Sequence, residues 1–144
     1  MAENKFGDKN VKIMNLTPHS VIVLRDDAEG AIVGTTGFGP AAKESKFSLV
    51  AEYKPVGKVA RAAQKDELKG ELEIDGHKVP VIKTIFGEPT DLPAPEEGTM
   101  LIVSILTAQA AKAAGRKGDD LIITSDPVRD AAGKIIGCRK FAVA

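Results

Sequence analysis

Four arginines and one phenylalanine are the side chains of this sequence best suited to hold a charged ligand. The arginines lie far apart along the chain, at Arg61, Arg116, Arg129 and Arg139. A guanidinium group offers a planar fork of donors that fits phosphate oxygens. Phe86 is the last large apolar side chain before a proline-containing loop, and an aromatic ring stacked on a nucleobase contributes about 1–3 kcal/mol. These residue types suit a nucleotide with a pyrophosphate, although surface salt bridges and closure of a core account for them equally well.

The sequence lacks the spacings that are typical of catalytic and metal sites. It contains no GxSxG, HExxH or CxxC motif. The two histidines, His19 and His77, stand far apart, whereas a zinc site needs several ligands at regular spacing. Cys138 has no evident partner in the sequence, which favours a buried, inert thiol. We therefore expect no catalysis, no metal and no cofactor; the alternative is a small nucleotide-processing enzyme that uses His19 or the pair Glu96 and Glu97.

The composition favours one domain in the cytoplasm. The chain has 144 residues, which is enough for a single core. Lysine and arginine together equal aspartate and glutamate at 20 each, so no net charge attracts DNA or RNA. The start of the chain has no apolar signal sequence, and no stretch reaches the roughly 20 apolar residues that cross a bilayer. We expect residues 1–10 to form a flexible leader and residues 11–144 a single β-rich domain.

The elements around Phe86 can be placed from their local patterns. Asp75-Gly76 lies between residues 70–74 and 77–85 and predicts a hairpin, because Asp-Gly tolerates the positive φ values of a type I′ turn. Prolines in residues 86–98 predict an extended loop there. The apolar run 100–106 predicts a central strand covered on both faces. An alanine-rich helix should follow over residues 107–114, capped by Thr107.

The remaining patterns predict further hairpins. Residues 11–15 and 21–24 read as an opening hairpin, and residues 128–139 as a hairpin around Gly133. Strands paired in sequence order need no parallel crossover. The predicted fold class is α+β and mostly antiparallel, with β-hairpins and a central strand packed by one short helix.

Four segments of the chain carry a resemblance to a known family. They are NLTPHSVIV, KVARAA, VPVIKTIFGEPTDLPAPEEGTMLIVSILTAQAA and DLIITSDPVRDAAGKIIGCRKF. They resemble small proteins of phages and prophages, the phage anti-Thoeris sponge proteins. The resemblance covers most of the chain except the leader and residues 26–55, which look like an insertion.

The resemblance implies a protein that sequesters a signalling nucleotide without changing it. Members of that family capture cyclic ADP-ribose isomers in the host cell cytoplasm and so block TIR-based (Thoeris) defence, and some relatives also hold cyclic oligonucleotides. The resemblance further implies a β-rich homodimer or higher oligomer with pockets near the subunit interface. The alternative, on composition alone, is a phage structural or assembly protein without a small-molecule ligand.

The same resemblance assigns roles to individual residues. Arg61 and Arg116 would grip the pyrophosphate, and Phe86 would stack on adenine. An asparagine expected in the proline loop is replaced by Thr90 and Asp91, and Asp91 is included among the expected ligand contacts. Arg129 and Arg139 are the further candidates.

Overall fold

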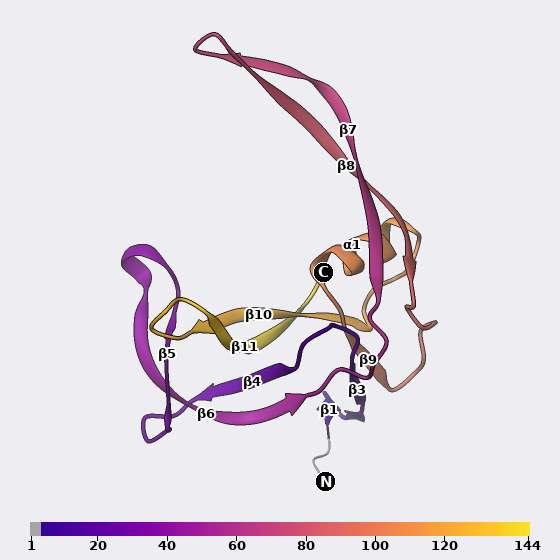
Figure 1. The fold of residues 1–144 in the computed structure, drawn as a ribbon. Helices are drawn as coiled ribbons and strands as arrows, with labels where there is room; N and C mark the ends of the chain where they lie inside the picture. Colours follow the sequence, from indigo (N-terminus) through magenta and orange to yellow (C-terminus); the bar gives the residue numbers. More distant parts are fainter. Residues whose placement is uncertain (1–3) are drawn as a thin grey trace.

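Most strands of the protein belong to one sheet that curls into a barrel. The computed structural model describes residues 4–144. Seven strands pair in the order β11-β4-β6-β5-β10-β9-β3. Their bounds are β3 (Lys12–Asn15), β4 (Val21–Asp26), β5 (Ile32–Thr36), β6 (Lys43–Tyr53), β9 (Thr99–Ile102), β10 (Leu121–Arg129) and β11 (Ile135–Val143). Because β11 also pairs with β10, the strands β11, β4, β6, β5 and β10 close on themselves (Figure 1).

The predicted class, mostly antiparallel β with one short helix, is confirmed. The expectation that parallel pairing would be unnecessary is wrong, because β3 pairs with β9, β9 with β10, and β4 with β11 in parallel. The prediction of an opening hairpin is also wrong, because β3 pairs with β9 and β4 pairs with β6. These pairings join segments far apart in the chain, and no local sequence pattern specifies them.

A buried amide fixes the turn between β3 and β4. The Asn15 side chain is 1% exposed. Its Oδ1 accepts bonds from the backbone N–H and the hydroxyl of Thr17 at 2.9 and 2.6 Å, and its Nδ2 donates to the carbonyl oxygens of His19 and Tyr53 at 2.7 and 2.8 Å. Three of these bonds hold the loop 16–20 to Asn15, and the fourth, to Tyr53, joins Asn15 to the end of β6, so the chain is turned away from β3 instead of folding back along it.

The helix α1 (Ile105–Ala113) begins two residues earlier than predicted. Ser104, not Thr107, is the cap, because its hydroxyl accepts from the Thr107 backbone N–H at 3.2 Å. Thr107 is instead buried and donates to the carbonyl of Ala60 at 3.1 Å. The predicted end at Gly115 is confirmed by its φ of 101°, the left-handed conformation that stops a helix.

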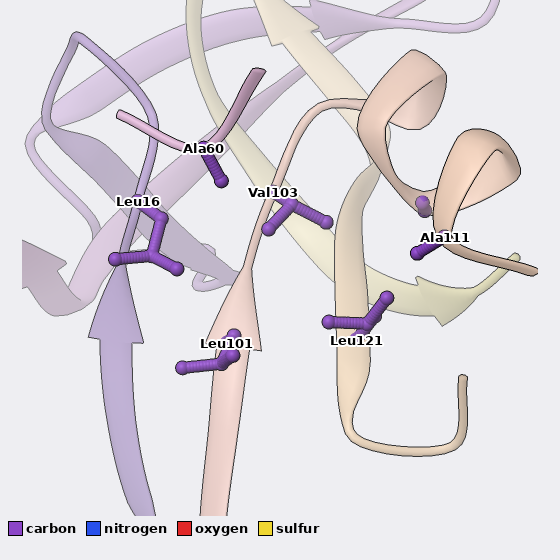
Figure 2. Close-up of a cluster of buried hydrophobic side chains, with 7 residues drawn as sticks. Leu16, Ala60, Leu101, Val103, Ala111 and Leu121 are labelled. Carbon is purple, nitrogen blue, oxygen red and sulfur yellow. The ribbon is translucent and has the colours of Figure 1, made fainter. Parts of the chain in front are cut away.

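Alanines let α1 pack closely on the sheet. One apolar cluster joins β9, β10 and α1, and its members are Leu16, Ala60, Leu101, Val103, Ala108, Ala111 and Leu121 (Figure 2). Each is at most 4% exposed. This cluster holds α1 against the sheet at the end of the molecule where a long hairpin, residues 61–90, begins.

A second buried group lies inside the barrel. Phe47 on β6 packs with Leu24 on β4 and Val128 on β10, and all three are at most 2% exposed. A Cβ atom at position 34 would collide with the Val128 side chain, so β5 can approach β10 this closely only because residue 34 is glycine. Segment 26–55, interpreted above as an insertion, thus supplies barrel strands and core residues.

Two long strands leave the barrel as an arm. They are β7 (Arg61–Ile74) and β8 (His77–Thr90), paired only with each other. The predicted turn is confirmed, since Asp75 and Gly76 have φ values of 49° and 80°. The hairpin is longer than predicted: residues 86–90, assigned above to a loop, continue β8, and the loop begins at Asp91. We call β7 and β8 the arm (Figure 1).

The start of the described chain forms a small hairpin of its own. Residues 1–3 of the predicted leader lie outside the described residues, and β1 (Lys5–Phe6) pairs with β2 (Lys9–Asn10). The Tyr53 hydroxyl donates to Asn4 Oδ1 at 3.0 Å, which ties this hairpin to β6. No helix between residues 4 and 144 has the length and apolar character needed to cross a membrane.

Candidate ligand site at the arm base

Three side chains of the arm turn toward the helix. Ala62 pairs with Pro89, and Gln64 with Phe86, so Ala62, Phe86 and Pro89 share one face of the ribbon. They are the arm residues that are partly buried, whereas the rest of β7 and β8 is exposed. Since α1 is the helix against which the arm packs, Phe86 lies on the face toward the body, at the part of the arm that we call the arm base.

Arg61 lies on the other face of the same ribbon. It pairs with Thr90 and precedes Ala62, and neighbouring residues of a strand point to opposite faces. An irregularity in the ladder between Ala62 and Gln64 sets two residues of β8 opposite Ala63, so Phe86 falls on the face of Ala62 and not on that of Arg61. Arg61 is exposed. Within one chain, Arg61 and Phe86 therefore do not face the same space.

Arg116 lies at the arm base, held in place by three bonds. Its Nη2 lies 2.6 Å from Asp120 Oδ2 and its Nε 3.4 Å from Asp120 Oδ1, and Nη1 donates to the carbonyl of Pro93 at 2.7 Å. The Arg116 and Asp120 side chains are 12% and 15% exposed. Three of the five N–H donors of a guanidinium are used here, which leaves two for a ligand. The pair also fixes the proline loop against the end of α1.

A small cavity joins Arg116 to the face that carries Phe86. Its volume is about 190 Å³, and it is lined by Glu88, Pro89, Leu92, Ala111, Ala114 and Arg116. Pro89 belongs to the same ribbon face as Phe86. Arg116 thus lies on the side of the arm that carries Phe86, although Phe86 itself does not line this cavity.

Asp91 stands at the end of the arm. It follows Thr90, the register partner of Arg61, so Asp91 and Arg61 lie at the same end of the ribbon. Its φ of 57° is unusual for a residue with a side chain, and it turns the chain out of β8 into the loop 91–98.

The other two arginines belong to the barrel. Arg129 pairs with Thr35 on β5, at the end of β10 away from the arm (Figure 1). Arg139 on β11 lies between two carboxylates, with Nη1 3.0 Å from Asp26 Oδ1 and Nη2 2.7 Å from Asp126 Oδ2. Burial opposes the charge of Arg139, but bonds to Asp26 and Asp126 outweigh it and raise the guanidinium pKa. Arg139 thus ties together β11, β4 and β10, and neither arginine is near Phe86.

A larger hollow than the one at the arm base lies on the barrel. We call it the barrel groove; it has a volume of about 810 Å³ and runs between the start of β4, the end of β9, and strands β10 and β11. Isoleucines dominate its wall, among them Ile22, Ile105, Ile123 and Ile135, with hydroxyls and Lys134 at the rim. Sequence reasoning missed this groove because four separate segments supply it, and each reads alone as an ordinary core strand or loop.

Cys138 forms part of the groove wall and is 3% exposed. Burial raises the pKa of its thiol above the ordinary value. A raised pKa keeps the thiol protonated and unreactive. Among residues 4–144, no three histidine, cysteine or carboxylate side chains gather closely enough to hold a metal ion.

Comparison of the chain with protein-family models, curated proteins and solved structures finds no match.

Proposed function

We propose that this protein is a non-enzymatic sponge for a cyclic ADP-ribose-type signalling nucleotide and that it blocks TIR-based (Thoeris) antiphage defence in the host cytoplasm. The observation that carries the proposal is the placement of Phe86 and Arg116 on the same side of the arm base. The ring of Phe86 would stack on the base, and the two free donors of Arg116 would bind phosphate oxygens.

The rigid setting of Arg116 supports capture. A guanidinium already oriented by Asp120 and Pro93 loses little freedom when an anion binds, and such preorganisation lowers the entropic cost of binding. Its partial burial also strengthens the attraction to phosphate, because fewer waters screen the charge.

Capture at low concentration requires more enclosure than one chain provides. The cavity of about 190 Å³ is smaller than the roughly 300–1,000 Å³ of typical ligand pockets. A nanomolar dissociation constant corresponds to a binding free energy of about −12 kcal/mol. Arginines exposed to water do not supply that much. We propose that a second copy of the chain closes the site, and that Arg61, on the outward face of the arm, acts on the ligand held by that second copy.

Recovery of the ligand tests the proposal. Purified protein is incubated with each cyclic ADP-ribose isomer, separated from free ligand, heated and analysed by mass spectrometry. A sponge returns the nucleotide with its mass unchanged. A hydrolysed product would identify an enzyme instead, and no retained nucleotide would exclude this class of ligand.

The exposed arm favours a second candidate, a phage structural or assembly protein. A hairpin of 14 residues per strand with apolar side chains in solvent is suited to interlock subunits of a larger particle. Fractionation of infected cells distinguishes the two functions, because a structural component sediments with capsids and a sponge stays in the soluble fraction.

A further inference from the structure

The barrel groove has the size of a small-molecule cavity. Its volume of about 810 Å³ lies within the roughly 300–1,000 Å³ of typical ligand pockets, whereas the cavity at the arm base measures about 190 Å³. The two hollows share no lining residue. The groove is therefore a separate site from the arm base.

The floor of the groove is apolar and closed. Ile102, Val103 and Cys138 line it and are at most 3% exposed, and each belongs to a core cluster. Ile105 and Ile135 at the mouth are 52% and 55% exposed. Covering such side chains with an apolar ligand is favourable in proportion to the area removed from water. The groove therefore favours a ligand with an apolar body.

The lining of the groove carries one full charge, on Lys134, and this charge is unpaired. Lys134 is exposed, and none of the ion pairs between residues 4 and 144 includes it. The Asp130 carboxylate nearby accepts instead from the backbone N–H groups of Ala132 and Lys134, at 2.9 Å each. Among the described residues, no carboxylate lines the groove. A ligand with one negative charge would therefore find its partner at the rim.

Buried polar groups hold the rim of the groove in place. Thr17 and His19 line one side, and Asn15, which is 1% exposed, bonds to both of them. On another side Ser104 caps α1, and its hydroxyl donates to the buried Thr107 hydroxyl at 2.9 Å. A rim that is fixed before the ligand arrives lowers the entropic cost of binding.

A strained residue shapes a third side. Asp126 in β10 has a φ of 55°, which is uncommon for a residue with a side chain. The register sets Ser125 and Pro127, but not Asp126, opposite residues of β11, and Ser125 and Pro127 both line the groove. Arg139 holds Asp126 by an ion pair of 2.7 Å. Strain of this kind persists only where the surrounding contacts enforce it, and it is common at ligand sites.

We propose that the barrel groove binds a small amphipathic anion, a fatty-acid-type molecule with an apolar chain and one carboxylate. The chain lies along the isoleucines above the buried floor, and the carboxylate lies at the rim, where Lys134 neutralises it. Ser20, Thr124 and Ser125 supply hydroxyl donors in the same lining. Separate parts of the groove thus match the apolar body and the acidic head.

A chain-length series tests the apolar part of the site. The purified wild-type chain is titrated by calorimetry with hexanoate, octanoate and decanoate below their micelle concentrations. One site per chain is expected, and each added methylene should tighten the dissociation constant about fourfold, equivalent to about 0.8 kcal/mol per buried CH₂. Failure of all three to bind, or an affinity that does not depend on chain length, would overturn the proposal.

Substitutions of Lys134 test the charged part. Lys134→Met keeps the aliphatic stem and should weaken decanoate binding about fivefold, as expected for an ion pair at an exposed position, with decanol binding unchanged. Lys134→Glu should weaken decanoate binding at least tenfold and tighten that of decylammonium. Lys43→Met removes another exposed lysine, outside the groove, and should bind decanoate like wild type. Equal decanoate affinity in Lys134→Glu and wild type would contradict the assigned contact.

Methyl NMR tests the location, because the arm also exposes apolar side chains. With isoleucine methyl groups labelled, decanoate should shift the signals of Ile105, Ile123 and Ile135 in the groove and leave those of Ile74 and Ile82 on the arm unchanged. Shifts confined to the arm would overturn the proposal. So would co-sedimentation with phosphatidylglycerol vesicles without binding of monomeric decanoate, since the groove would then be a membrane contact.

Discussion

Phe86 and Arg61 lie on opposite faces of the same two-stranded ribbon, although both belong to the arm base. Phe86 shares its face with Ala62 and Pro89, and Arg61 lies opposite Thr90. A single ligand on one side of the arm can therefore meet Phe86 and Arg116 of one chain but not Arg61 of that chain. The proposed site is complete only when two chains contribute to it.

Replacing Phe86 by alanine should weaken nucleotide capture. Loss of a stacking ring costs about 1–3 kcal/mol, or about 5- to 150-fold in dissociation constant. Phe86 is only partly buried and lies outside the core clusters, so the melting temperature should change little. Phe86→Tyr retains the ring and is the matched control for calorimetric titration. Equal affinity for Phe86→Ala and wild type would remove this ring from the site.

Arg116 should have a structural and a ligand role that can be separated. Arg116→Ala leaves Asp120, 15% exposed, without its partner, which should cost about 1–3 kcal/mol of unfolding free energy in urea. The double variant Arg116→Ala with Asp120→Ala removes both charges and should recover much of that stability. Binding should stay lost in both variants. If the double variant binds the nucleotide like wild type, Arg116 is structural only.

The Cys138 thiol should resist modification in the folded protein. Burial raises its pKa, so the folded state holds this proton more tightly than the unfolded chain does. The resulting stability is present below the ordinary thiol pKa and is lost as pH rises through the raised value. A disulfide reagent at mildly alkaline pH should label Cys138 only after denaturant is added. Labelling of native protein at the rate of a free cysteine would contradict the buried position.

The arm should be dispensable for the fold. No buried residue of the described chain lies in β7 or β8, so trimming residues 67–83 and joining the register partners Asp66 and Thr84 with Asn-Gly should leave the melting temperature close to that of wild type. A trimmed protein that unfolds would show that the arm contributes to the core in solution.

Local signals in the sequence predicted local structure well. Asp75-Gly76 and Gly133 located two hairpins, because a positive φ at such residues is a property of the turn itself. Gly115 marked the end of the helix for the same reason. The start of the helix was misplaced, since Ser104 and Thr107 are both suitable caps; the Ser104 hydroxyl accepts from the Thr107 backbone N–H, while the Thr107 hydroxyl donates to Ala60.

Non-local relationships escaped prediction. Closure of the barrel depends on β11 meeting both β4 and β10, and neither contact has a signature in either strand. The ladder irregularity beside Ala63 moved Phe86 to the face opposite Arg61, and a bulge of this kind does not show in the pattern of apolar residues. Phe86 was assigned to a loop and lies in β8, and the faces of the candidate residues and their distribution between arm and barrel had to come from the structure.

The most direct test of the central claim is calorimetric titration of the purified wild-type chain with a cyclic ADP-ribose isomer, followed by mass spectrometry of the heat-released ligand. The account predicts tight, saturable binding and release of the nucleotide with unchanged mass. Absence of binding to every isomer, or release of a hydrolysed product, would contradict it.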